Sequence, residues 1–145
     1  MRQNLLIFSP RMAHAEETYA ALNKYDISAS IAYDAKEAVA ILVTDSPDFF
    51  WLDVDIEAAQ MFLTEISNRT LRPPPYIILT SSFGNSKLRA VLLDQGADTC
   101  IETPVDLSEI RAILDAVLRR EEIYTHAFDK NKKAASEALQ QGLEI

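Results

Sequence analysis

The sequence predicts an α/β fold in which five parallel strands form one doubly wound sheet. Five short runs rich in apolar, β-branched or aromatic residues recur about every 20 to 27 residues, and a segment with helical periodicity follows each run. Two neighbouring parallel strands must be joined by a right-handed crossover that is long enough to contain a helix. Regular alternation of strand and helix therefore predicts a parallel sheet with helices on both faces.

The strand runs differ in how their apolar residues are arranged. Ser28–Tyr33 alternates along its length, which suits a strand at the edge of the sheet. Leu5–Phe8, Phe49–Leu52 and Tyr76–Leu79 are apolar on both faces, as buried central strands are. With Ala97–Ile101 as the fifth strand, this distribution predicts the flavodoxin-like strand order 2-1-3-4-5.

Helical periodicity predicts the connecting elements. Gly96 follows the fourth of them, where a left-handed residue commonly ends a helix. Apolar residues after Arg120 fall near helical spacing, which favours an extra C-terminal helix. We expect one domain over residues 1–121 and a helix or linker over 122–145. The expected helices are Met12–Lys24, Ala35–Thr44, Glu57–Asn68, Ser86–Gln95 and Leu107–Arg120.

The composition restricts the functions open to this chain. Its 145 residues carry 14 Lys plus Arg against 22 Asp plus Glu, a net charge of -8, which disfavours a nucleic-acid surface. The longest apolar run, Ala38–Val43, is far below the ~20 residues of a membrane-spanning helix. One cysteine and two histidines are too few for a disulfide or a zinc site. We expect a cytoplasmic protein that contacts neither nucleic acid nor membrane.

Candidate site residues follow from the fold class. In an open parallel sheet, ligands bind beyond the carboxyl ends of the strands, near the point where strand order reverses. A site here would bring together side chains from several strand ends. The residues at those ends are Ser9, Pro10, Asp53, Thr80, Ser81, Glu102, Thr103 and Pro104.

Four segments near these strand ends form a pattern that is specific in its order and spacing when the four are taken together. They are Pro47–Asp53, Ile77–Ser81, Gly96–Asp98, and Thr103-Pro104 followed by Asp106–Glu109. Together they resemble the receiver domain of bacterial two-component response regulators, over residues 4 to about 121. The resemblance implies signal transduction by phosphorelay, with a histidine kinase or an output protein as the partner.

The resemblance also implies roles for individual residues. In the family, an aspartate at the end of the third strand accepts a phosphoryl group from a histidine kinase, and Asp53 has that position. A Thr or Ser hydroxyl ends the fourth strand, and Thr80 has that position. The family further has a pair of acids after the first strand, which helps to bind Mg²⁺, and a Lys before the proline that follows the fifth strand.

Several positions depart from that pattern. Because Mg²⁺ is usually held by carboxylates, Asp53, assisted at most by Asp55, would bind it weakly if at all. Phosphoryl transfer to a carboxylate depends on cations that neutralise the oxygens. We therefore expect a degenerate pseudo-receiver that is not an enzyme and has no firmly bound cofactor. Ser9 and Pro10 replace the acids, Thr103 replaces the lysine, and Cys100 replaces the Tyr or Phe that turns inward in many receivers.

Three functions remain open from the sequence. The first is a module that acts by protein contact, as a homodimer through its fourth helix, fifth strand and fifth helix. The second is an active phosphoacceptor, in which Asp55 or Glu57 replaces the missing ligands of Mg²⁺ around Asp53. The third, an enzyme or nucleotide binder, is disfavoured because Ser9–Met12 stands where a Gly-rich phosphate loop would be.

Overall fold

The sheet has five parallel strands in the predicted order, β2-β1-β3-β4-β5. The computed structural model describes residues 3–10, 12–23, 27–69, 71 and 74–120. These residues fall into two compact units that divide between Leu107 and Ser108. β2 lies at one edge of the sheet, as its alternating sequence predicts. The strands are β1 (Gln3–Phe8), β2 (Ile27–Ala32), β3 (Phe49–Asp53), β4 (Tyr76–Ser81) and β5 (Thr99–Glu102).

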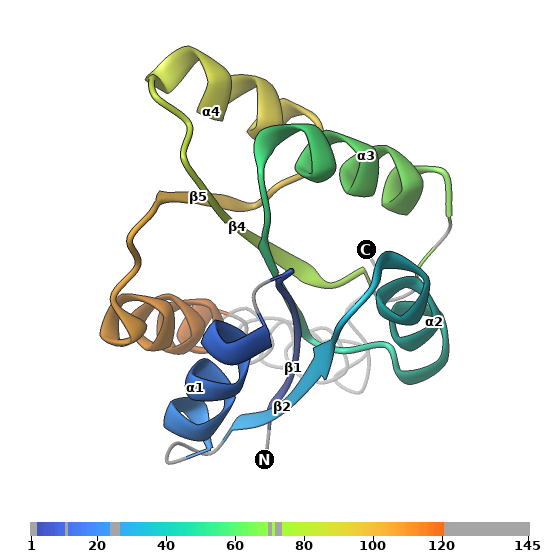
Figure 1. Ribbon diagram of the computed structural model, residues 1–145, viewed down its shortest axis with the longest axis vertical. Helices are drawn as coiled ribbons and strands as arrows, with labels where there is room; N and C mark the ends of the chain where they lie inside the picture. Colours follow the sequence, from blue (N-terminus) through green and yellow to red (C-terminus); the bar gives the residue numbers. More distant parts are fainter. Residues whose placement is uncertain (1–2, 11, 24–26, 70, 72–73, 121–145) are drawn as a thin grey trace, which may run out of the picture. The chain divides into compact units, whose positions relative to one another are not determined.

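Helices of the first unit cover both faces of the sheet. They are α1 (Met12–Leu22), α2 (Ala35–Asp45), α3 (Ile56–Ser67) and α4 (Ser86–Asp94). Figure 1 shows α1 on one side and α2, α3 and α4 on the other. Each crossover between parallel strands thus carries a helix, as the fold class requires.

A further helix spans residues 107–120, almost all of it in the second unit. Arg111 and Asp115 form an exposed ion pair one turn apart along it, at 2.8 Å. The predicted segment 122–145 lies outside the described residues. No helix in the described part of the chain is long and apolar enough to cross a membrane.

The core contains both faces of the central strands. On one face, Leu6 pairs in register with Phe50, which pairs with Ile77, and all three belong to the main apolar cluster under α2, α3 and α4. On the other face Ile7 lies beside Trp51, and both are about 1% exposed. Complete burial of one such side chain stabilises the fold by roughly 1.5–3 kcal/mol.

Three helices begin at a side chain that accepts a backbone N–H of the first turn. Asp34 accepts from Glu37 at 2.7 Å, starting α2, and Asn85 caps α4 in the same way. Asp55 accepts from Ala58 at 2.8 Å and starts α3. Such caps satisfy amides that have no partner inside the helix.

The fifth strand begins at Thr99, so its predicted start at Ala97 is wrong. The N–H of Ala97 donates to the carbonyl of Leu92 and closes the end of α4. The Asp98 carboxylate then accepts the N–H of Ile77 at 2.7 Å. Because the Asp98 side chain, and not a backbone carbonyl, accepts this N–H, the regular pairing of β5 with β4 starts one residue after Asp98, at Thr99. Gly96 has a positive φ of 122°, which agrees with its predicted place after α4.

Other boundaries moved by a residue or two. β3 and β4 do end at Asp53 and Ser81, as the sequence predicted, and both of these polar residues are buried. α3 starts at Ile56, directly after its cap. The predicted end of the first helix at Lys24 lies outside the described residues.

Candidate functional site

Three of the predicted site residues meet at the carboxyl ends of the central strands. Ser9 directly follows β1, Asp53 ends β3, and Thr80 is the residue of β4 that pairs with Asp53 in the sheet register. All three are buried, with exposed fractions of 1%, 5% and 0%. The sheet itself therefore assembles this group, as the strand-end rule predicts.

Both carboxylate oxygens of Asp53 accept hydrogen bonds from hydroxyls. The Ser9 hydroxyl donates to Oδ2 at 3.0 Å, and the Thr80 hydroxyl donates to Oδ1 at 2.9 Å. A buried carboxylate is costly unless it is hydrogen-bonded, and bonds to a charged group are stronger than those between neutral groups. Ser9 and Thr80 thus stabilise the burial of Asp53.

Trp51 extends this network into the core. Its indole N–H donates to the Thr80 hydroxyl oxygen at 2.9 Å. An indole can only donate and a carboxylate can only accept, so the direction of each bond is fixed. The Thr80 oxygen accepts from Trp51, and its proton points to Asp53. Among the described residues, no buried side-chain nitrogen or oxygen atom lacks a partner.

The end of β5 and the residue after it pair with the end of β4 and the loop between β4 and α4. Glu102 accepts the N–H of Phe83 at 2.9 Å, and the Thr103 hydroxyl lies 3.0 Å from that of Ser82. The N–H of Thr103 donates to the Ser81 carbonyl, and the Thr103–Pro104 peptide bond is cis. Thr103 thus joins two loops through neutral groups and has no positive charge to offer the site.

Asp55 and Pro10 are both exposed. Oδ1 of Asp55 caps α3, so part of this carboxylate has a structural role. Within the described ranges, no cluster of three or more His, Cys, Asp or Glu residues could hold a metal ion. Mg²⁺ prefers several carboxylate or water oxygens. One buried carboxylate that already accepts two hydroxyls is therefore a poor fit for it.

Cys100 is half-buried. β5 is an edge strand, so only part of the side chain packs against the core. Its thiol lies 4.0 Å from the Arg89 carbonyl. Burial raises the pKa of the thiol, and the Arg89 charge lowers it by a smaller amount.

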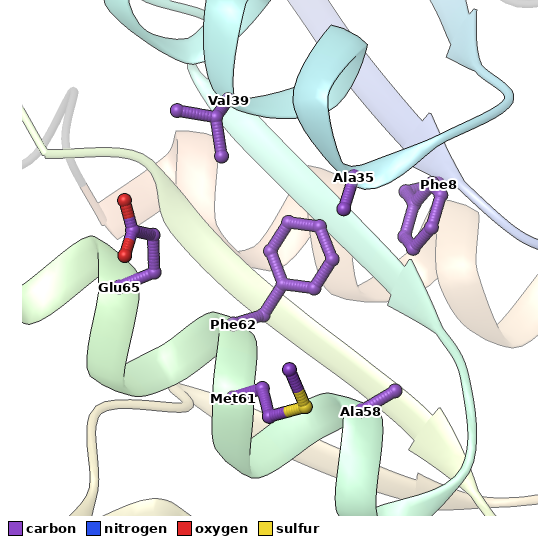
Figure 2. Close-up of a pocket in the computed structure, with 7 residues that line it drawn as sticks. All are labelled: Phe8, Ala35, Val39, Ala58, Met61, Phe62 and Glu65. Carbon is purple, nitrogen blue, oxygen red and sulfur yellow. The ribbon is translucent and has the colours of Figure 1, made fainter.

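A separate apolar hollow of about 290 Å³ lies between α2 and α3. Figure 2 shows Phe62 at its centre, with Phe8 beside it. Met61 also lines the hollow and is largely exposed. The rings of Phe8 and Phe62 are 5.0 Å apart. The residues that line it are Phe8, Ala35, Val39, Ala58, Met61, Phe62 and Glu65. Its single charged residue, Glu65, already pairs with Arg69 along α3.

Sequence reasoning missed the hydrogen bond between Trp51 and Thr80. Trp51 lies two residues before Asp53 and therefore on the same strand face, which is the signal that could have found the contact. The register then puts Trp51 diagonally across from Thr80, within reach of an indole. An apolar run describes burial, however, and does not describe which polar atom a large side chain reaches.

Comparisons with known proteins agree with this fold. The family model of the response regulator receiver domain matches residues 11–115. A two-component response regulator from Clostridium difficile has 21% sequence identity and a TM-score of 0.70, over 83% of this chain and 98% of that one. A response regulator from Desulfuromonas acetoxidans has 19% identity and a TM-score of 0.69, over 81% of this chain and 97% of that one.

A longer protein also contains this fold. NtrX from Brucella abortus, solved in complex with ADP, has 19% identity and a TM-score of 0.71. The match covers 93% of this chain and 30% of that chain, so the similarity concerns one part of the longer protein. At these identities the solved structures establish the fold alone. No curated protein matches the sequence.

Proposed function

Because the chain belongs to the response regulator receiver domain family, and is therefore a signal transduction domain, we propose that it acts through protein contacts while phosphorylation at Asp53 is impaired. One observation carries this proposal: the Asp53 carboxylate accepts the hydroxyls of Ser9 and Thr80. These donors are neutral, so they stabilise the carboxylate without supplying a positive charge. Ser9 has the position for which the resemblance implies an acid.

The chemistry of phosphoryl transfer supports the impairment. Transfer to Asp53 would bring two anions together, and it depends on cations at the oxygens. Ser9 and Pro10 carry no carboxylate for Mg²⁺, and Thr103 carries no ammonium group. Removal of one stabilising contact commonly costs ~3 kcal/mol, or roughly 100-fold in rate. Loss of two independent contacts would then slow the reaction by about four orders of magnitude.

A phosphodonor experiment tests this proposal. The protein is incubated with acetyl phosphate and Mg²⁺, and its intact mass is followed over time. We expect no gain of a phosphoryl group, under conditions in which an active receiver domain is modified. Asp53→Asn provides the background. A phosphorylated species that forms in the native chain and is missing from Asp53→Asn would contradict the impairment.

An active phosphoacceptor is the second candidate. Asp53 and Thr80 keep the places that the family uses, and the exposed Asp55 lies two residues beyond Asp53, where one of its oxygens could take part in binding Mg²⁺. Trp51 contacts Thr80, so its fluorescence should respond to Mg²⁺ and beryllofluoride if this candidate is correct. A response that is lost in Asp55→Asn would favour it over the impaired receiver.

The partner we propose is a protein, either a histidine kinase or an output protein. We also propose a homodimer through α4, β5 and the helix over residues 107–120. Val91 and Leu93, each 44% exposed on α4, support this assignment because they offer apolar surface. The net charge of -8 argues against nucleic acid as a partner of this chain. We propose a non-enzymatic role in the cytoplasm, away from the membrane.

A further inference from the structure

We propose that Trp51 is a positioning residue, which fixes the Thr80 hydroxyl on Asp53 and thereby holds the site in its unphosphorylated arrangement. The proposal rests on the impaired phosphorylation proposed above and adds a residue that contributes to it. Nothing in the receiver pattern of the sequence assigns a role to this tryptophan. Its contact with Thr80 crosses from β3 to β4 inside the core.

The geometry leaves the Thr80 hydroxyl little freedom. Its oxygen accepts the indole N–H at 2.9 Å, and its proton goes to Asp53 Oδ1, also at 2.9 Å. Trp51 and Thr80 are 1% and 0% exposed, so solvent does not reach this chain of bonds. Donation into a hydroxyl polarises it and strengthens its own donation. The indole therefore both orients the hydroxyl and tightens its bond to Asp53.

Movement of the hydroxyl would break this arrangement. If Thr80 turned toward an oxygen of a group attached to Asp53, the indole N–H would lose its acceptor in a buried position. A buried donor without a partner carries the full penalty of its desolvation. Trp51 thus opposes the rearrangement that would accompany modification of Asp53.

The strand register explains why a tryptophan can do this. Trp51 pairs with Ile78, and Asp53 pairs with Thr80, so Trp51 lies diagonally across from Thr80 on the same face of the sheet. A diagonal neighbour is beyond the reach of a short side chain but within that of an indole. An aliphatic residue at this position could fill the space, but it could not donate.

The experiment removes the donor and keeps the shape. Trp51 is the only tryptophan of the chain, so growth of an auxotrophic host on benzothienylalanine replaces it alone. This analogue carries sulfur in place of the indole N–H. Three-bond scalar couplings to the methyl carbon of Thr80 then report its χ1 rotamer in solution. We expect one rotamer in the native protein and averaging over two or more in the analogue.

Two controls make the result decisive. Ser9→Ala removes the other hydroxyl from the same carboxylate, and we expect Thr80 to keep a single rotamer in that variant. Trp51→Phe is measured as well, in case the analogue protein does not fold, with the same averaging expected. A single Thr80 rotamer after loss of the indole donor would overturn the proposal, because packing alone would then fix the side chain.

The phosphodonor assay distinguishes the impaired phosphorylation of Asp53 from the positioning role of Trp51. A mass gain in the native protein, together with averaging of Thr80 in the analogue, would overturn the impairment and keep the positioning role. No mass gain in the native protein, together with one Thr80 rotamer in both proteins, would keep the impairment and overturn the positioning role.

Discussion

At the scale of single residues, Asp53 is a charged group that the protein stabilises with hydroxyls. Burial to 5% exposure removes most of its hydration, and the bonds from Ser9 and Thr80 replace part of it. A hydrogen bond to a charged group contributes roughly 1.5–3 kcal/mol. The Ser9 side chain therefore has a structural role that an acid at the same position could not have without a bound cation.

Ser9→Asp should make the stability of the protein depend on Mg²⁺. The change replaces a donor to Asp53 with a second carboxylate, and like charges at one buried site repel. We expect a lower Tm than that of the native chain in EDTA. Because Mg²⁺ relieves such repulsion, an excess about 100 times its Kd should restore ~2.7 kcal/mol, a gain of several degrees. Differential scanning calorimetry with and without Mg²⁺ measures both effects.

Ser9→Ala is the matched control for this prediction. It removes the same hydroxyl without adding charge, so it should lower the free energy of unfolding by about 1–3 kcal/mol whether or not Mg²⁺ is present. Equal Mg²⁺ responses of Ser9→Asp and Ser9→Ala would show that a second carboxylate at this position does not create a cation site.

The Cys100 thiol should titrate above its ordinary pKa of 9.0, because burial disfavours the thiolate. The rate of alkylation as a function of pH should have a higher midpoint in the native than in the unfolded protein. Since the folded pKa is the higher one, stability is unaffected well below pH 9 and decreases as pH rises past that value. Arg89→Ala should raise the midpoint further, and coincident native and unfolded profiles would contradict the prediction.

At the scale of elements, Asp55 shows how one side chain can carry two interpretations. Its place after β3 suggested a metal ligand, and its Oδ1 starts α3. We expect Asp55→Ala to lower the free energy of unfolding by about 1 kcal/mol, as the loss of an N-cap does, in urea denaturation. Asp34→Ala removes the cap of α2 and is the control for the helix effect alone.

Mg²⁺ distinguishes the two roles of Asp55. If it only caps α3, Asp55→Ala and Asp34→Ala should lose similar stability, and neither loss should change when Mg²⁺ is added. A larger loss for Asp55→Ala in Mg²⁺ than in EDTA would mean that the native carboxylate binds the cation, and it would favour the active receiver.

The helices and strands were predictable because burial leaves a signal in the pattern of apolar residues along the sequence. Phe49–Leu52 is apolar at every position since β3 is covered on both faces, and its type and place in the sheet follow. The start of β5 was not predictable in the same way. The Asp98 carboxylate replaces a backbone acceptor there, and that substitution depends on where Ile77 lies in the folded sheet.

The candidate site was likewise predictable only in part. The strand-end rule predicts that Ser9, Asp53 and Thr80 lie together, because parallel strands bring their carboxyl ends to one edge. The hydrogen-bond directions among them were beyond sequence reasoning, since they depend on the register of β3 against β4 and on the indole of Trp51. The sequence alone shows that Ser9, Pro10 and Thr103 replace the acids and the lysine of the family. It does not show the hydrogen bonds from hydroxyls to Asp53.

At the scale of the whole molecule, the proposed homodimer makes a prediction about association. Each copy carries a charge of -8, so two copies repel, and pairing must come from apolar surface such as Val91 and Leu93 on α4. Sedimentation equilibrium should detect a dimer, and added salt should strengthen it by screening the repulsion. Val91→Glu should weaken association at least about tenfold, which corresponds to ~1.4 kcal/mol.

Val43→Glu is the matched control for that experiment. Val43 is exposed to a similar degree, but it lies on α2, outside the proposed surface. The added charge is the same, so a general effect of charge would weaken both variants equally, whereas a dimer through α4 would be weakened by Val91→Glu alone. A native chain that stays monomeric at high concentration in high salt would exclude the homodimer, and contact with a different protein would then be the mode of signalling to pursue.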